Sequence, residues 1–237
     1  MTMVIYGRQP VHECLRAGRR RVRGVWCTEA AAQEPWLAGG PGRPNPTIVG
    51  GDEVARRAGS EAHQGVCAEV DPYHYAGAAE LLAREAPLIL VLDEVQDVQN
   101  LGAIARTAEC AGAAGLVIPE RRAAEVTPAA CKASAGAVEH LPIARVRNVA
   151  DFLGEAKDAG AWTYGAAGDA PEAVRWDEPD YRGTCVLVLG AEGKGLRPRV
   201  RSACDQLVAL PLAGRVDSLN VSAAAAALVF EAVRQRA

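Results

Sequence analysis

Asp217 to Arg236 reads DSLNVSAAAAALVFEAVRQR, and this stretch decides how the second half of the chain is expected to fold. Alanine loses the least free energy on entering a helix, so the alanine run predicts a helix. Ser218, Asn220 and Ser222 precede the run, and short polar side chains of this kind cap the first turn of a helix. An apolar strand at 206–210 and a glycine-containing loop lead into this start. Because ligands of open α/β sheets bind at strand-to-helix junctions, we expect a ligand site here as well as a helix cap.

Upstream of this helix, short apolar runs alternate with helical patterns, beginning with the continuous run LILV at Leu88 to Val91. Such alternation is typical of an α/β fold with a mostly parallel sheet and helices on both faces. The pattern predicts strands at 88–92, 115–118, 142–146, 161–165, 184–189 and 206–210, and helices at 100–111, 127–138 and 149–158, followed by a short helix and the final one.

The first part of the chain shows a smaller alternation of strands and helices, from Val4 to about Val70. We therefore expect a small α/β domain at 1–72, a linker at 73–86 and the larger domain at 87–237. The loop GGPGRPNP at 39–46 interrupts the small domain. The small domain also contains a cluster of five arginines. This cluster could be a solvated face or a surface that contacts phosphate, because guanidinium pairs well with phosphate. These arginines are Arg16, Arg19, Arg20, Arg21 and Arg23.

Composition restricts the classes of protein to which the chain can belong. A net charge of -3 gives no overall attraction to nucleic acid, so any such role must depend on local patches. The seven cysteines form no C-x-x-C pair and the chain has four histidines, so we expect buried thiols, no metal and no disulfides. No apolar run approaches membrane-spanning length and the N-terminus lacks a signal peptide, which predicts a cytoplasmic protein without membrane association.

Two further loops carry residues that could do chemistry. GAEGKG, from Gly190 to Gly195, follows an apolar strand, and glycines at that place let backbone approach a ligand closely. The spacing fits neither a Walker loop nor the dinucleotide fingerprint, and Glu192 argues against a polyphosphate ligand. After the strand at 88–92, Asn100 is placed to cap the next helix, and Arg106 follows as either a surface residue or a functional cation.

Three blocks occur in the order found in a known family: QNLGAIARTAECAG (99–112), LVLGAEGKGLRP (187–198) and LPLAGRVDSLNVSAAAAA (210–227). With a fourth, KASAGAVEHLP (132–142), they resemble the SpoU (TrmH) family of S-adenosylmethionine-dependent RNA ribose 2′-O-methyltransferases, in the SPOUT class. The front region, with IYGRQPVHECL and HQGV, looks like the small ribosomal-protein-like RNA-binding domain of the RlmB-like branch. One departure is Val98, where the family usually has proline.

The resemblance implies a sheet whose C-terminal segment forms a trefoil knot, an S-adenosylmethionine site in the knot loops and a homodimer. Carried over by motif position, Arg106 is implied to be the key catalytic residue, contacting the target ribose and its adjoining phosphate. The other implied active-site residues are Asn100, Glu192, Ser218 and Asn220, and those implied to hold the methyl donor are Gly190, Leu210, Leu219, Glu192 and Gly193.

The resemblance also implies an RNA partner, namely 23S ribosomal RNA methylated on a guanosine ribose, with transfer RNA as the alternative. A non-catalytic RNA-binding protein of the same fold is a rival, but it would be expected to lose polar residues at Asn100, Arg106 or Ser218. A dinucleotide-dependent oxidoreductase is a further rival. It would need a phosphate-binding glycine motif after the strand at 88–92, and none is present there.

Overall fold

Two separate β-sheets organise the computed structural model, which describes residues 2–38, 44–168 and 170–237. One compact unit contains the chain up to His74 together with Glu125–His140, and the other contains Tyr75–Ala124 and Leu141–Ala237. The segment 125–140, which the family blocks place inside the C-terminal domain, therefore packs with the front of the chain. The expected boundaries at 72 and 87 stay a prediction.

The first unit holds a four-stranded mixed sheet in the order β1-β4-β2-β3. β4 is antiparallel to both β1 and β2, whereas β3 is parallel to β2. The strands are β1 (Met3–Tyr6), β2 (Val22–Cys27), β3 (Thr47–Ile48) and β4 (Val66–Val70), and the helices are α1 (Arg8–Ala17), α2 (Glu29–Ala32), η1 (Pro35–Leu37), α3 (Gly51–Ala58), η2 (Glu61–His63), α6 (Pro128–Ala133) and η3 (Ala137–Glu139).

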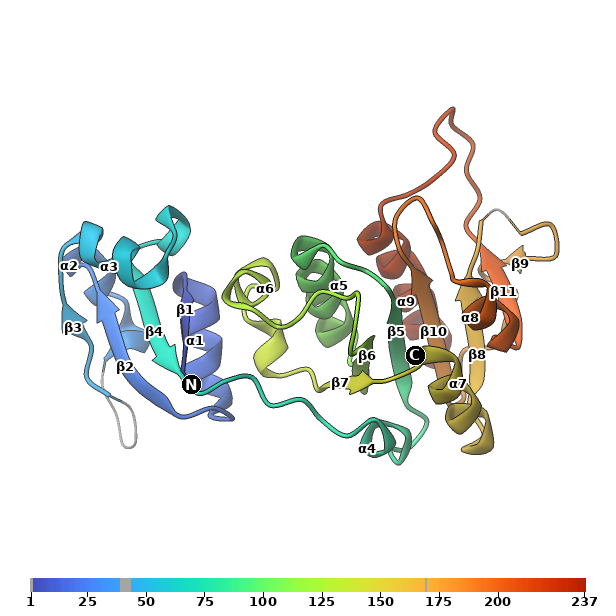
Figure 1. Cartoon of the computed structure of the whole chain (residues 1–237), viewed down its shortest axis with the longest axis horizontal. Coiled ribbons are helices and arrows are strands. Elements are labelled where there is room, and N and C mark those ends of the chain that lie inside the picture. The colour runs from blue at the N-terminus through green and yellow to red at the C-terminus, as the bar shows by residue number, and fades with distance from the viewer. Residues whose placement is uncertain (1, 39–43, 169) are drawn as a thin grey trace. The chain divides into compact units, whose positions relative to one another are not determined.

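The second unit is built on a seven-stranded sheet whose neighbouring strands all run parallel, in the order β7-β6-β5-β10-β8-β11-β9 (Figure 1). This confirms the α/β class and the parallel sheet, while the knot stays a prediction. The strands are β5 (Leu88–Asp93), β6 (Gly115–Pro119), β7 (Ile143–Val146), β8 (Trp162–Ala166), β9 (Val174–Arg175), β10 (Cys185–Gly190) and β11 (Gln206–Ala209). The two-residue strand β9 was not predicted.

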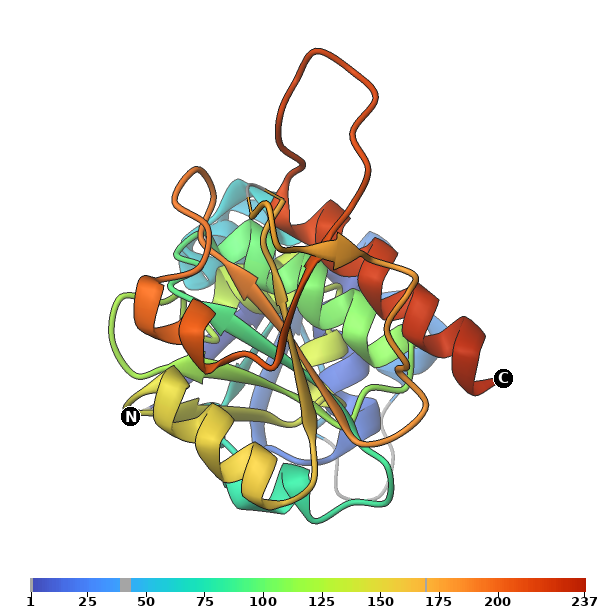
Figure 2. The same cartoon turned by 90° about the vertical axis from the view of Figure 1, so that its right-hand side faces the viewer.

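Helices cover both faces of this sheet, with α5 (Val98–Cys110) beside α9 (Val221–Arg236) on one face and α7 (Val149–Asp158) beside α8 (Pro198–Ala203) on the other (Figure 2). α4 (Ala78–Leu82) precedes β5. Side chains alternate across a strand, so β5 serves both layers. All six of its residues are buried, and Ile89 and Val91 belong to the core that includes Phe152 of α7 and Val200 of α8.

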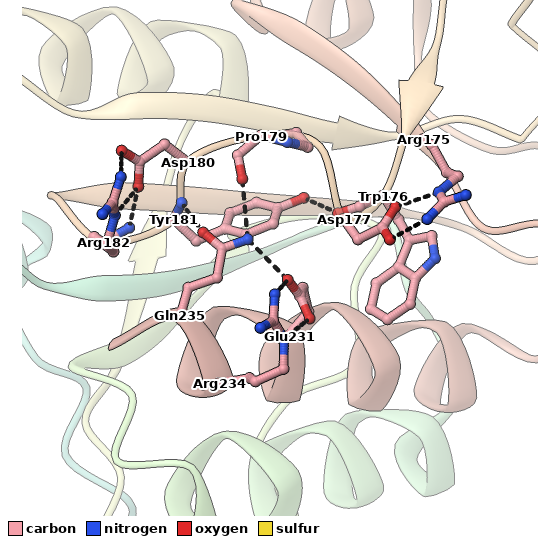
Figure 3. A network of polar contacts seen from close by, with 10 residues as sticks. All are labelled: Arg175, Trp176, Asp177, Pro179, Asp180, Tyr181, Arg182, Glu231, Arg234 and Gln235. Atoms are coloured by element: carbon pink, nitrogen blue, oxygen red, sulfur yellow. Dashed lines mark hydrogen bonds and ion pairs between the residues drawn. The ribbon is translucent and has the colours of Figure 1, made fainter. Parts of the chain in front are cut away.

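Polar contacts with the segment 176–183 hold the C-terminal half of α9 (Figure 3). The Tyr181 ring is fully buried, its hydroxyl donates to the Trp176 carbonyl at 2.6 Å, and its backbone N–H donates to Gln235 Oε1 at 2.9 Å. Gln235 Nε2 donates to the Pro179 carbonyl at 3.1 Å and to Glu231 Oε1 at 2.8 Å. Each buried polar group in this cluster has a partner, so α9 is fixed at the end remote from its cap.

Arg20 is not part of an exposed phosphate-contacting surface, and that prediction is wrong. Its side chain is buried and forms a bidentate ion pair with Glu139 of η3, one contact joining Arg20 Nε to Glu139 Oε2 at 3.0 Å. Arg20 also donates to the Asp71 carbonyl at 3.4 Å. Arg16, Arg19, Arg21 and Arg23 are exposed.

The predicted helix at 127–138 is in fact two short elements, α6 and η3. Ala135 and Gly136 separate them with φ values of 50° and 87°, a left-handed conformation that ends a right-handed helix. The cysteines are all free, and Cys110 is exposed although buried thiols were expected. Among the described residues, no helix combines the length and apolar character needed to cross a membrane.

Breaking the Arg20–Glu139 pair provides a test of this packing. Glu139→Leu leaves a buried guanidinium without its carboxylate, so the free energy of unfolding falls by about 3–5 kcal/mol. Arg20→Met combined with Glu139→Leu recovers most of that loss, because no charge stays buried. Urea unfolding of the intact chain, followed by circular dichroism, measures both. A single variant as stable as wild type would contradict the account.

Candidate active site

The loops after β5, β10 and β11 leave the same edge of the parallel sheet, because all three strands point the same way. Asp97, rather than Asn100, caps the helix that follows the first loop, accepting from the Gln99 N–H at 2.8 Å. Asn100 therefore lies inside α5, with a buried side chain that is not used for capping. This corrects the predicted cap and leaves the Asn100 carboxamide available for another contact.

Three of the predicted polar residues meet in one network made by Asn100, Glu192 and Asn220. Glu192 Oε1 accepts from Asn100 Nδ2 at 2.8 Å and from Asn220 Nδ2 at 2.8 Å. Asn220 Nδ2 also donates to Asn100 Oδ1 at 3.0 Å. A carboxylate that accepts two amide N–H groups forms charge-assisted bonds, which are shorter and stronger than neutral ones. The network joins α5, the loop after β10 and the start of α9.

Asn220 also caps α9, as the sequence predicts for a short polar residue at this place. Its Oδ1 accepts from the Ser222 N–H at 2.8 Å and from the Ser222 hydroxyl at 2.5 Å. The cap fixes the orientation of the carboxamide, because Oδ1 faces the helix and Nδ2 must face Glu192. The capping interpretation and the functional interpretation of Asn220 are therefore compatible in one side chain.

The loop after β10 folds back on itself, and its glycines are required by close backbone contact. A Cβ at Gly190 would lie 2.1 Å from the carbonyl carbon of Gly195, which no side chain permits. Gly193 and Gly195 have φ values of 71° and 64°, and the Gly195 N–H donates to the Ala191 carbonyl at 2.9 Å. The result is a tight turn that exposes backbone and holds Glu192 toward the two asparagines.

An ion pair that sequence reasoning missed ties the first two loops together. Asp93, the fully buried last residue of β5, accepts from the Arg197 backbone N–H at 2.9 Å and from Arg197 Nε at 2.7 Å. Arg197 Nη1 lies 3.3 Å from Glu94 Oε1, and its hydrogen bond to Asp93 raises the pKa of the guanidinium. This ion pair could be predicted only from the sheet register. The register pairs Gly190 with Asp93, and so brings the end of β5 next to the loop that leads to Arg197.

The structure does not bring every predicted residue into this network. Arg106 is exposed on α5, and its side chain has no hydrogen-bond or ion-pair partner among the described residues. Ser218 and Leu219 lie on the exposed segment 211–220, which projects from the sheet edge between β11 and α9 (Figures 1 and 2). Leu210 is half-buried where this segment begins. The fixed part of the site is therefore the network of Asn100, Glu192 and Asn220. The guanidinium of Arg106 and the hydroxyl of Ser218 lie outside this network.

Comparison with known proteins identifies the family. The SpoU rRNA Methylase family model matches residues 87–230, and the model for RNA 2′-O ribose methyltransferase substrate binding matches residues 4–76. The chain belongs to the SpoU methylase family. It is an S-adenosylmethionine-dependent RNA ribose 2′-O-methyltransferase with an N-terminal substrate-binding region, which confirms the family, the activity and the methyl donor expected from the sequence.

Individual relatives are similar to this chain over nearly its whole length. The 23S rRNA (guanosine-2′-O-)-methyltransferase RlmB of Pseudomonas putida is 42% identical, over 98% of this chain and 96% of that protein. The AdoMet complex of the SpoU methyltransferase AviRb from Streptomyces viridochromogenes is 27% identical with a TM-score of 0.82, over 99% of this chain and 90% of AviRb. An AdoMet-bound rRNA methyltransferase from Sinorhizobium meliloti is 25% identical with a TM-score of 0.82, over 98% and 87% of the respective chains.

Two substitutions at Asn220 separate capping from the network. Asn220→Asp keeps the capping oxygen but loses both Nδ2 bonds and places a second carboxylate beside Glu192, whereas Asn220→Ala loses cap and network together. We expect each variant to lose about 1–2 kcal/mol of unfolding free energy, the alanine variant through the lost cap and the aspartate variant through repulsion between two adjacent carboxylates. Methyl transfer should fall in both. Full activity of Asn220→Asp would mean that the network is dispensable.

Proposed function

We propose that this enzyme uses S-adenosylmethionine to methylate the ribose 2′-hydroxyl of a guanosine in 23S ribosomal RNA. The observation that carries the proposal is the Asn100–Glu192–Asn220 network, which joins α5, the loop after β10 and the start of α9 at one place. Full-length similarity to a 23S rRNA guanosine methyltransferase supports the choice of RNA and nucleoside. Ribosomal RNA is in the cytoplasm of bacterial cells, which is where we place the enzyme.

The residues at this edge fit a bound methyl donor. The Gly190–Gly195 turn exposes its backbone because Gly190 has no Cβ where it contacts Gly195, and Leu219 is 48% exposed. Backbone N–H groups and exposed leucine suit a nucleoside with an amino acid tail, so Gly190, Gly193, Glu192, Leu210 and Leu219 would hold it. S-adenosylmethionine, when bound, supplies an electrophilic methyl group next to these residues.

Arg106 is the residue that we assign to the ribose. An exposed guanidinium without a carboxylate partner keeps its donors free for a phosphate and for the ribose oxygen. Because a guanidinium stays protonated in proteins, proton abstraction is an unsuitable role for Arg106. Arg106 instead orients the hydroxyl and stabilises the alkoxide that develops as the hydroxyl proton passes to solvent water, and Ser218 and Asn100 position the guanidinium and the ribose.

The first unit supplies RNA contacts through arginines that remain exposed. Arg16 pairs with Glu13 at 3.2 Å and Arg23 with Asp71 at 2.7 Å, whereas Arg19 and Arg21 have no ion-pair partner among the described residues. A surface arginine without a carboxylate can accept a phosphate with no competing ion pair. We assign RNA binding to a domain at 1–72, joined by a linker at 73–86 to the catalytic domain at 87–237.

Dimer formation and the knot complete the proposal. α9 carries an alanine run and Phe230, a residue that is 50% exposed, and small residues beside an exposed aromatic ring suit contact with a second copy of the same helix. The C-terminal segment forms the trefoil knot of the family. Sedimentation of the intact chain at the mass of a single 24.8 kDa protomer would contradict the dimer.

Replacing Arg106 tests the catalytic assignment. Arg106→Ala should lower kcat for methyl transfer by roughly 100-fold or more, while equilibrium binding of S-adenosylmethionine stays unchanged. Arg106→Lys retains the charge but loses the planar fork, so its turnover should also be low. Turnover of Arg106→Lys close to wild type would contradict a positioning role that depends on two parallel hydrogen bonds.

Mapping methylated riboses in total RNA from a deletion strain tests the substrate. We expect one 2′-O-methylguanosine to be lost from 23S rRNA and to return when the wild-type gene, but not the Arg106→Ala gene, is supplied. A ribosomal pattern that stays intact while a transfer RNA mark disappears would assign the enzyme to transfer RNA. Loss of no mark at all would contradict the proposed activity.

A further inference from the structure

Three motifs noted in the sequence, IYGRQPV, HQGV and KASAG, meet at one place in the first unit, although the third lies far along the chain. We propose that Lys132, together with Arg8 and Gln64, forms a binding site for a backbone phosphate of the RNA substrate. The inference rests on the proposed function and adds a residue from outside the substrate-binding match at 4–76.

Gln64 is the centre of the cluster. Its backbone has a φ of 54°, and Gly65 follows with a φ of 81°, so the chain turns sharply between η2 and β4. The Gly65 N–H donates to His63 Nδ1 at 2.9 Å, which fixes the turn. Gln64 Oε1 accepts from Lys132 Nζ at 2.6 Å and from the Arg8 N–H at 3.2 Å. One neutral oxygen thus holds an ammonium against the start of α1.

Lys132 is in an unusual position for a lysine. It is half-buried, and Gln64 is its only side-chain partner, with no carboxylate in contact among the described residues. Partial burial lowers the pKa of its ammonium group. A Cβ added at Gly7 would lie 2.6 Å from Lys132 Nζ, so the absence of a side chain at Gly7 makes room for the ammonium. A charge that loses hydration without gaining a counter-ion has an unfilled preference for an anion.

Arg8 adds a second cation that is only partly neutralised. Its side chain is 46% exposed, and Nη1 lies 2.8 Å from Glu34 Oε1, while Nε donates to the Gln64 carbonyl at 3.4 Å. Arg8 and Lys132 together therefore carry one more positive charge than the carboxylate beside them. Both cations contact Gln64, Lys132 through Oε1 and Arg8 through the carbonyl oxygen, so we expect a phosphate of the RNA backbone bound beside Gln64 to accept from both.

Titration of protein-free 23S rRNA transcript over a series of salt concentrations tests the site, with wild type compared with Lys132→Gln, Lys132→Arg and Gln64→Glu. Lys132→Gln should bind the transcript about tenfold more weakly, with a slope of log affinity against log salt lower by about one. Lys132→Arg keeps the charge and should retain most of the wild-type slope.

Gln64→Glu separates binding from packing. The glutamate keeps the contact with Lys132 but supplies the missing carboxylate, so the fold is at least as stable and the transcript binds about as weakly as to Lys132→Gln. A lysine that only packs α6 against the turn would give the opposite pattern, with wild-type binding. Lys157→Gln is the matched control: Lys157 pairs with Asp205 in the second unit and its loss should leave the salt slope unchanged.

The outcomes distinguish this inference from the proposed function. Wild-type salt slopes in both Lys132→Gln and Gln64→Glu, with normal transcript binding by wild type, would overturn the site and leave the proposed function intact. A wild-type protein whose affinity for the transcript is weak and independent of salt would overturn the proposed function itself. Binding of S-adenosylmethionine to each variant reports whether the second unit is folded.

Discussion

The carboxylate of Glu192 determines how the candidate active site is assembled at the edge of the parallel sheet. Glu192 accepts hydrogen bonds from Asn100 and Asn220, side chains that are 120 residues apart in the sequence. Parallel strands deliver their loops to the same edge of the sheet, but they do not fix the loops relative to one another. The shared carboxylate does so, because each carboxamide that points elsewhere would leave a polar group without its partner. The position of the α9 cap and the shape of the turn after β10 both depend on it.

The site therefore combines a fixed part with an open part. Asp93 and Arg197 hold the bases of two loops, and the glycine turn carries Glu192 to the network. The segment 211–219, by contrast, is exposed throughout and carries Ser218 and Leu219. A methyltransferase must admit a large RNA and a small donor to one place, and the proposed contact residues Ser218, Leu219 and Arg106 all lie on exposed surface.

Much of this could be predicted from the sequence, because the strongest signals are local. The order of strands and helices in the second unit follows from apolar runs and helical periods, and each predicted strand there is present. The α9 cap at Asn220 is also a local signal. The set of polar residues came from family motifs, and three of them do converge, but no local pattern shows that a single carboxylate joins them.

The errors came from interactions that are distant in sequence or from backbone conformation. Arg20 looked like its exposed neighbours because its partner, Glu139, is 119 residues away. Asn100 was predicted to be a cap because the helix was expected to begin at residue 100, whereas α5 begins at Val98 and Asp97 caps it. The helix predicted at 127–138 is rich in alanine, but Gly136 is a poor helix former, and the positive φ values at Ala135 and Gly136 divide the segment there. The pairing of Asp93 with Arg197 needed the strand register.

The most direct test of the account is a double-mutant cycle on methyl transfer, with Asn100→Ala, Asn220→Ala and the double variant compared with wild type by kcat/KM. If the two carboxamides act through one carboxylate, removing the second costs much less once the first is gone, and the coupling free energy is about 1 kcal/mol or more. Effects that add to within about 0.3 kcal/mol would show that Asn100 and Asn220 act independently, and would contradict a site assembled by Glu192.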